Sequence, residues 1–230
     1  MTPFVLAATV AIEDRVAAAA SAFRAINSAR CGQLGVPYPP KELYLRGFKK
    51  EGELEAWVGD GLHGLKRFKI FRITASSGSL GPKRKEGDGQ VPEGFYTISG
   101  FNPQSQFLLS MRVSYPNAYD LRQNKKNPGG DIFIHGNSVT IGCIPIGDDG
   151  IRQLYTLCGD FRRGRKALIP VHLFPARLGA NSWGQLKRDY SDSPQLLSFW
   201  TSVKRAFDLF EATKRIPRIV ARSTGYSVLP

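Results

Sequence analysis

Short apolar runs, each broken by glycine or by charged residues, fill the middle of this 230-residue chain. LYLRGF, LEAWVG and FKIFRIT follow one another between Glu42 and Thr74 and have the length and residue types of β-strands. Later runs of the same kind are FYTISGF, FLLSMRVSY, GDIFIHG and KALIPVHLFPA. The 24 glycines and 15 prolines suit a chain with many turns and disfavour a helical bundle. We therefore expect a mainly β fold of the α+β class.

Helical patterns lie on both sides of these strands. Residues 4–30 are rich in alanine, and the spacing of Ile12, Val16, Ala20 and Phe23 is typical of a helix. This pattern predicts one or two short helices that end at the cluster of Gly32, Gly35 and Pro37. A further helix is expected near 150–164, and another after Ser193, with Pro194 in its first turn. Three segments follow: an N-terminal helical segment at 1–40, a β-rich domain at 41–180, and a C-terminal helical extension at 181–230 that packs on it.

The composition restricts the kinds of partner that the protein can bind. No apolar run reaches the ~20 residues of a membrane-spanning helix, so no transmembrane segment is expected. The run TPFVLAATVA at residues 2–11 suits either a trimmed signal peptide or the first turns of a helix. A net charge of +13 favours anionic partners: nucleic acid, acidic lipid or an anionic wall polymer. Since no nucleic-acid-binding motif accompanies the charge, we expect no nucleic-acid partner.

Cysteine and histidine are too sparse for a disulfide framework or a metal centre. Of three cysteines, Cys31 and Cys158 form the one conceivable bridge. The three histidines lie far apart in the sequence, and none has a cysteine at ligand spacing. We therefore expect neither a metal nor an organic cofactor.

The segment 131–151, DIFIHGNSVTIGCIPIGDDGI, carries the most chemistry. His135 ends an apolar strand, and Cys143 follows after a polar loop. A neighbouring imidazole is a common means of activating a thiol. The N–H groups of Gly142 and Cys143 could point at a developing oxyanion. The alternative interpretation is a buried cysteine in a strand with a structural histidine nearby.

The pair His135-Gly136, followed by Thr140-Ile141-Gly142-Cys143, resembles the active-site motif of the YkuD-domain L,D-transpeptidases. The short gap between histidine and cysteine is most similar to the YafK-like branch of that family. Other segments of the chain resemble the same branch in the same order. They are GPKRKEGDGQVPEGFY (81–96), NPQSQF (102–107), YPNAYD (115–120), HLFPARL (172–178) and SFW…F…FE…P (198–217). The resemblance covers about residues 42–217.

This resemblance implies a YkuD-type β-sandwich catalytic domain at 41–180 with flanking N- and C-terminal helices. It implies a cysteine enzyme of the periplasm that acts on peptidoglycan stem peptides through a thioester acyl-enzyme, attacking the carbonyl at the L-centre of a diamino acid. Cys143 would be the nucleophile and His135 the general base and later acid. The Gly136 carbonyl would orient the imidazole, and the N–H groups of Gly142 and Cys143 would bind the oxyanion.

The chain departs from the family pattern in two places, and the binding residues are less defined. Many members have histidine directly before Gly-Cys and arginine two residues after the cysteine, where this chain has Ile141 and Pro145. Arg177 is our candidate for contacting a substrate carboxylate, with an ordinary solvated arginine as the alternative. Further candidates for substrate binding, each of which a structural or solvated role would also explain, are Tyr115, Asn117, Asp88, Glu93, Ser138 and Thr140.

The acyl acceptor and the leaving group distinguish three activities that share the same acyl-enzyme. An amine of another stem peptide gives a cross-link or an exchanged terminal residue, and this L,D-transpeptidase activity is the interpretation we prefer. Water gives an L,D-carboxypeptidase. A leaving group that is a lysine amine of a wall-anchored protein gives an amidase. The alternative of another class is a non-catalytic wall-binding module.

Overall fold

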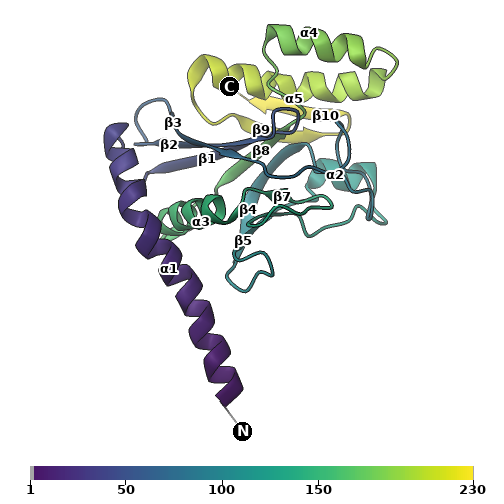
Figure 1. The fold of residues 1–230 in the computed structure, drawn as a ribbon. Coiled ribbons are helices and arrows are strands. Elements are labelled where there is room, and N and C mark those ends of the chain that lie inside the picture. The colour runs from purple at the N-terminus through teal and green to yellow at the C-terminus, as the bar shows by residue number, and fades with distance from the viewer. Residues whose placement is uncertain (1–2, 230) are drawn as a thin grey trace.

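A curled, mixed sheet of eight strands forms the centre of the molecule (Figure 1). The structure, a computed structural model, describes residues 3–229, with side chains from Arg15 onward. The strands are β1 (Glu42–Phe48), β2 (Glu53–Gly59), β3 (Lys66–Arg72), β4 (Gly94–Asn102), β5 (Ser110–Val113), β6 (Phe133–His135), β7 (Ile144–Pro145) and β8 (Pro170–Phe174). Their order in the sheet is β3-β2-β1-β8-β4-β5-β6-β7. The pairs β1–β8 and β6–β7 are parallel, and the other neighbours are antiparallel.

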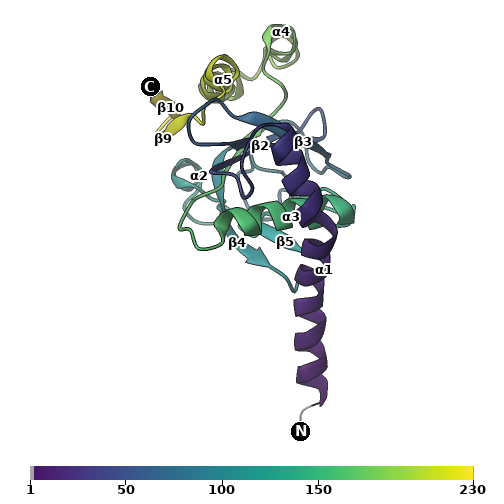
Figure 2. The same ribbon diagram turned by 90° about the vertical axis from the view of Figure 1, so that its left-hand side faces the viewer.

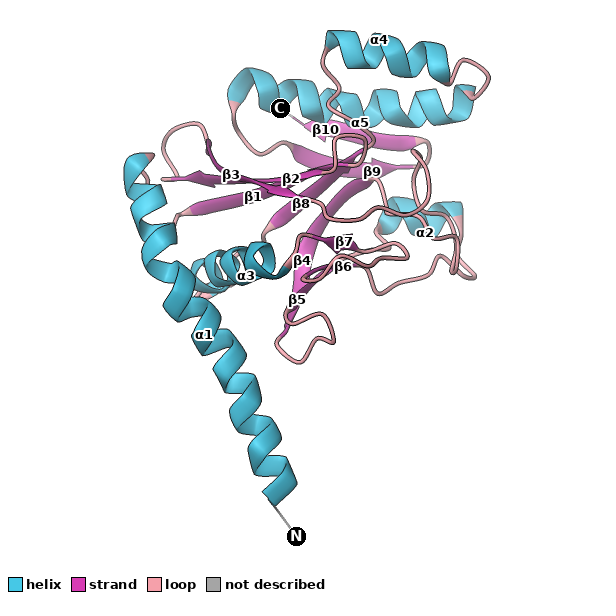
Figure 3. Ribbon diagram, in the orientation of Figure 1, coloured by secondary structure: helices cyan, strands magenta, loops and turns pink. Residues whose placement is uncertain are grey.

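The predicted α+β class with a mainly β core is confirmed (Figure 3). Each predicted strand run contains a strand, and the glycine-rich stretch at 78–93 has no regular secondary structure. The sheet changes direction at β4, which pairs with β8 through its first half and with β5 through its second. This curl separates the β5–β6–β7 end from the β1–β2–β3 end.

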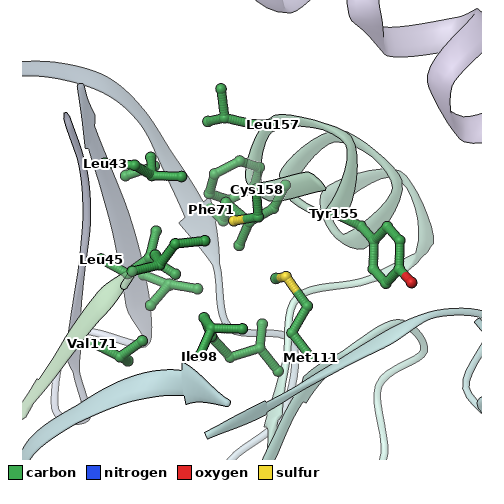
Figure 4. Close-up of a cluster of buried hydrophobic side chains, with 14 of the residues drawn as sticks. Leu43, Leu45, Phe71, Ile98, Met111, Tyr155, Leu157, Cys158 and Val171 are labelled. Atoms are coloured by element: carbon green, nitrogen blue, oxygen red, sulfur yellow. The ribbon is translucent and has the colours of Figure 1, made fainter. Parts of the chain in front are cut away.

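Two helices cover one face of the β1–β2–β3 end: α1 (Pro3–Gln33) and α3 (Asp148–Arg162) (Figures 1 and 2). The core beneath them includes Leu43 and Leu45 of β1, Ile98 of β4 and Cys158 of α3 (Figure 4). The N-terminal part of α1 projects beyond the rest of the molecule (Figure 2). Instead of one or two short helices, α1 is a single helix of 31 residues, because an alanine-rich segment without glycine or proline has nothing to interrupt it before Gly32.

The C-terminal part of the chain covers the opposite face. It contains α4 (Ala180–Asp189), α5 (Pro194–Thr213) and a hairpin of β9 (Arg218–Arg222) and β10 (Gly225–Leu229) (Figure 1). The sequence predicted α5 but not the hairpin, α4 or the short helix α2 (Ala118–Gln123). Tertiary packing holds the hairpin: the Tyr226 ring lies 4.6 Å from Phe95 and 5.1 Å from Tyr119. No local pattern reveals such contacts.

The cysteines outside segment 131–151 are structural. Cys31 and Cys158 are both fully buried and both free, so the conceivable bridge between them is not formed. Among residues 3–229, no helix is both long and apolar enough to cross a membrane. The run at residues 2–11 is helical from Pro3 onward, and Met1 and Thr2 lie outside the described residues.

A buried arginine joins the sheet to α5. Arg46 of β1 is 1% exposed and donates to Glu55 of β2 at 2.7 Å and to Glu211 of α5 at 2.8 Å. Its guanidinium also lies 4.3 Å from the centre of the Phe210 ring. Because the charge is paired and stacked on an aromatic ring, its burial is tolerated at this interface.

Replacing Arg46 with alanine should lower the free energy of unfolding by about 3 kcal/mol, because a buried carboxylate loses its nearest cation. Urea unfolding followed by circular dichroism measures the loss. Arg67 is the matched control: it lies 3.6 Å from the same Glu55 but is half exposed, so Arg67→Ala should cost about 1 kcal/mol or less. Equal losses in the two variants would contradict the importance of burial here.

Candidate active site

His135 and Cys143 line one cavity of about 330 Å³ at the β5–β6–β7 end of the sheet. His135 is the last residue of β6, and Cys143 immediately precedes β7. The parallel pairing sets His135 opposite Pro145, and this register brings the two side chains to the same hollow. The complete lining consists of Asn102, Gln104, Ser105, Gln106, Phe107, Ser110, Phe133, His135 and Cys143.

The His135 imidazole is held in one tautomer. Its Nδ1 lies 2.6 Å from the carbonyl oxygen of Gly136, which can only accept, so Nδ1 carries the proton and Nε2 keeps a lone pair. The ring of Phe107 packs against the imidazole at 4.5 Å between ring centres. Burial lowers the pKa of His135, and the bond to Gly136 offsets only part of this effect. The imidazole is therefore neutral at neutral pH and can accept a proton at Nε2.

Gly136 leaves no room for a side chain. A Cβ atom at this position would lie 2.7 Å from the Phe107 carbonyl oxygen and 2.7 Å from Oδ1 of Asp148. The same Asp148 oxygen accepts the N–H of Asn137 at 2.8 Å. The glycine thus lets the strand end pack closely against the β4–β5 connection and the start of α3, which fixes the carbonyl that holds the imidazole.

The Cys143 thiol is protonated at rest. Burial raises the pKa of this thiol, and a hydrogen bond from the backbone N–H of Phe133 lowers it only in part. The thiol donates to the carbonyl oxygen of Asp131, at 3.5 Å from sulfur to oxygen. Within residues 3–229 the sulfur has no hydrogen bond to His135, so proton transfer requires the thiol to turn toward Nε2. A neutral base beside a protonated thiol favours deprotonation during the attack over a standing thiolate.

Thr140 braces the turn that carries Cys143. Its hydroxyl donates to the carbonyl oxygen of Cys143 at 2.8 Å and accepts the N–H of Gly142 at 3.1 Å. This corrects the expectation that Gly142 offers a free oxyanion donor, because its N–H is already bound to Thr140. The backbone N–H of Cys143 has no acceptor among the residues that the structure describes. It is the donor of the expected pair that remains open to a substrate.

Gly142 also has a steric role. Its φ of +127° suits only glycine, and a Cβ atom would lie 3.1 Å from the Gln90 carbonyl oxygen. Gln90 belongs to the glycine-rich loop 78–93, which therefore backs the nucleophile turn.

Asp88 and Glu93, two of the predicted binding residues, organise this loop. Asp88 accepts the N–H groups of Arg84 at 2.8 Å and of Lys85 at 3.0 Å, and pairs with Lys83. Neither acid lines the catalytic cavity.

The fully buried Glu93 connects the loop to α5. Its carboxylate accepts the N–H of Gly81 at 2.7 Å and the indole N–H of Trp200 at 2.7 Å, and lies 3.1 Å from Nζ of Lys49. The carboxylate is thus satisfied within the protein and is not available to the amine of a diamino acid.

Three other predicted residues also make structural contacts. The buried Tyr115 donates its hydroxyl to the carbonyl oxygen of Pro128 at 2.8 Å. Asn117 caps helix α2 through its Oδ1 and donates from Nδ2 to the hydroxyl of Tyr226. Ser138 is exposed, and its backbone N–H donates to Oδ1 of Asn137 at 2.6 Å. None of these three residues lines the cavity.

Arg177 is turned toward the protein. Its guanidinium donates to Glu53 at 2.5 Å and to Glu55 at 2.8 Å, and it stacks on the ring of Phe48 at 4.4 Å. It does not line the Cys143 cavity. The structure therefore corrects the expectation that Arg177 binds a substrate carboxylate, because internal carboxylates already occupy it.

The sequence interpretation missed the amides of the cavity wall. Asn102 is the last residue of β4, and Gln104 and Gln106 follow in the connection to β5. All three lie in the segment NPQSQF (102–107), whose only significance in the sequence was its resemblance to the YafK-like branch. Several amide side chains close to a proline, between two predicted strands, could have indicated that this segment binds a ligand. Among the described residues, no group of three His, Cys, Asp or Glu side chains could hold a metal ion.

The chain is similar to known proteins in both sequence and fold. Residues 50–172 match the family model YkuD, described as an L,D-transpeptidase catalytic domain. YafK of Escherichia coli K12, provisionally named an L,D-transpeptidase, is 29% identical over 191 residues, which cover 81% of this chain and 73% of that protein.

Two solved structures have a similar shape. The helical cell shape determining protein Pgp2 of Campylobacter jejuni is 20% identical at a TM-score of 0.47, covering 78% of this chain and 72% of that one. Bd1075 of Bdellovibrio bacteriovorus is 18% identical at a TM-score of 0.43, covering 79% and 77% of the two chains.

Thr140→Val should slow the reaction of Cys143 with muropeptide by about tenfold or more, because both bonds that position the turn are lost and small displacements of a nucleophile are costly. Single-turnover kinetics followed by mass spectrometry gives the rate. Thr213→Val is the matched control, since Thr213 is an exposed threonine at the end of α5 whose hydroxyl bonds to the Leu209 carbonyl and the Arg215 N–H and does not line the cavity. A Thr140 variant as fast as the control would show that the brace is dispensable.

The pH dependence of Cys143 alkylation should separate the two titrating groups. Because burial lowers the pKa of His135 below its ordinary 6.5, its neutral form persists to lower pH and should assist the thiol throughout the neutral range. In His135→Ala that assistance is absent, and alkylation by iodoacetamide should follow one ionisation above the ordinary thiol value of 9.0. Unfolded samples of both proteins provide the control and should titrate alike. Overlapping profiles of the folded proteins would exclude activation by His135.

Proposed function

The chain belongs to the YkuD family of L,D-transpeptidase catalytic domains, and from this premise we propose that it is a cysteine-dependent L,D-transpeptidase of peptidoglycan stem peptides. The supporting observation is the cavity that Cys143 shares with a neutral His135 whose Nδ1 is held by Gly136. Residues 41–180 carry the catalytic domain in this proposal, the C-terminal extension packs on it, and the protein works in the periplasm, where its substrate is found.

The first half-reaction uses the groups described above. Nε2 of His135 takes the proton from the thiol as Sγ of Cys143 attacks the carbonyl carbon at the L-centre of the diamino acid. The N–H of Cys143 donates to the oxyanion that forms. When the tetrahedral intermediate collapses, the C–N bond breaks, His135 returns the proton to the leaving amine of the D-residue, and a thioester on Cys143 remains.

The second half-reaction depends on the acceptor. An amine from another stem peptide, deprotonated by His135, attacks the thioester and forms a cross-link or exchanges the terminal residue. Water in the same position would make the enzyme an L,D-carboxypeptidase. An amidase would differ already in the first half-reaction, where a lysine amine of a wall-anchored protein would leave in place of the D-residue. The transpeptidase is preferred because the matching family is described by that activity.

The amide-rich wall supports a peptide as the ligand. Asn102, Gln104 and Gln106 present donors and acceptors on the side of the cavity formed by the β4–β5 connection. Primary amides can pair with the N–H and C=O groups of a peptide backbone without adding charge. We assign to these side chains the positioning of the stem peptide across Cys143.

Brief exposure of the protein to a tetrapeptide muropeptide should produce a mass increase equal to the acyl group, located on Cys143. Cys143→Ala should remain folded and form neither adduct nor product, because the nucleophile is absent. Cys158→Ala is the control, since that thiol is fully buried in the core, and it should retain the adduct.

Product analysis then distinguishes the activities. A dimer or an exchanged terminal residue identifies the transpeptidase, whereas a tripeptide alone identifies the carboxypeptidase. Turnover by Cys143→Ala would refute the covalent mechanism. A wild-type protein that binds muropeptide without reacting would support the non-catalytic wall-binding module.

A further inference from the structure

A second polar hollow lies in the C-terminal part of the molecule. Helix α5 and the β9–β10 hairpin enclose about 310 Å³ and share no lining residue with the catalytic cavity. Figure 1 shows α5 and the hairpin on the face of the sheet opposite to α3. The aliphatic hydroxyl groups in its wall belong to Ser198, Thr201, Ser202, Thr224 and Ser227.

The charged groups of this wall are both cationic. They are Arg205 of α5 and Arg222 of β9, and no carboxylate lines the hollow. Arg222 donates from Nε to the hydroxyl of Ser227 at 3.1 Å, which leaves its terminal nitrogens available. Arg205 has no hydrogen-bond or ion-pair partner among the side chains that the structure describes, from Arg15 to Leu229. The acid one turn further along, Asp208, is paired with Lys204 at 2.6 Å. The hollow therefore attracts an anion that can accept from guanidinium groups.

The hairpin backbone that forms one wall is held by packing, while the side chains of Arg205 and Arg222 are exposed. Tyr226, at 4% exposed, anchors the hairpin in the aromatic cluster and bonds to Asn117 at 2.8 Å. At Gly225 the backbone has a φ of +147°, and a Cβ atom there would lie 2.5 Å from the hydroxyl oxygen of Ser202. The hairpin is thus packed directly on α5, so binding requires little ordering of the chain.

The hollow adjoins another that extends to α2. A space of about 420 Å³ is lined by Tyr119 and Gln123 of α2 and shares Ser198 and Thr224 with the first hollow. The chain after α2 runs to Asp131, whose carbonyl oxygen accepts the Cys143 thiol. We call the two hollows together the hairpin groove. It connects the C-terminal hairpin with the helix that precedes the catalytic strand.

We propose that the hairpin groove is a second subsite for a carboxylate-bearing peptide, in which Arg205 and Arg222 bind a stem-peptide carboxylate and the hydroxyl groups bond to its amides. This inference rests on the proposed function, because stem peptides supply such carboxylates on the same polymer as the reacting peptide. Planar guanidinium groups match carboxylates in a two-point geometry. Holding one peptide of a polymer raises the effective concentration of its neighbours at Cys143.

The test measures binding of the unreactive Cys143→Ala protein to purified sacculi by co-sedimentation in about 0.15 M salt, where distant surface charges are screened. Adding Arg205→Gln and Arg222→Gln should weaken binding about tenfold, because charge-assisted hydrogen bonds are lost. The matched control adds Arg188→Gln and Arg215→Gln, which removes two exposed charges elsewhere and should leave binding unchanged. Equal weakening in both proteins would mean that only overall charge matters and would overturn the subsite.

A second arm identifies the recognised chemistry. Sacculi stripped of their peptides should lose the difference between the two double variants. If the Arg205/Arg222 effect persists on stripped glycan, the carboxylate assignment is wrong. The proposed function is judged separately, by thioester formation in the protein with Cys143 intact, so its failure would not be confused with failure of the subsite.

Discussion

The parallel pairing of β6 with β7 is the constraint on which the active site depends. Two short strands at the edge of the sheet set His135 and Cys143 around one hollow. The residues beside these strands pack closely on other parts of the chain: Gly136 on the Phe107 carbonyl oxygen and Asp148, and Gly142 on the Gln90 carbonyl oxygen. Because a side chain at either glycine would disturb this packing, the two glycines help to hold His135 and Cys143 in place.

Support for this edge comes from distant parts of the chain. The loop 78–93 packs its Gln90 carbonyl against Gly142, and the loop itself is held by buried Glu93. Glu93 is bonded in turn to Trp200 of α5 and lies beside Lys49. The C-terminal helix is thus connected to the nucleophile turn through one buried carboxylate. Substitutions in α5 can reach the reaction by this route without contacting the substrate.

The electrostatics of the site select a particular chemical strategy. Burial keeps the imidazole of His135 neutral and the thiol of Cys143 protonated, since both charged forms are disfavoured away from water. The resting protein therefore does not hold a buried ion pair between the thiolate and the imidazolium. In the proposed mechanism the charges arise only when the proton moves to Nε2, where the Gly136 carbonyl would stabilise the imidazolium and the Cys143 N–H would face the oxyanion.

Local patterns in the sequence determined the mainly β fold, the strand runs and helix α5, and they singled out His135 and Cys143, which line one cavity. Strand alternation, helical spacing and the His-Gly and Gly-Cys motifs are all short-range signals. They did not reveal the β9–β10 hairpin, whose stability comes from the rings around Tyr226. Nor did they distinguish binding from structural roles. Arg177, Asp88 and Glu93 have the right chemistry for a substrate, but the folded chain satisfies each of them internally. Only the tertiary structure decided which polar groups stay open, because partners far apart in the sequence compete for every hydrogen bond.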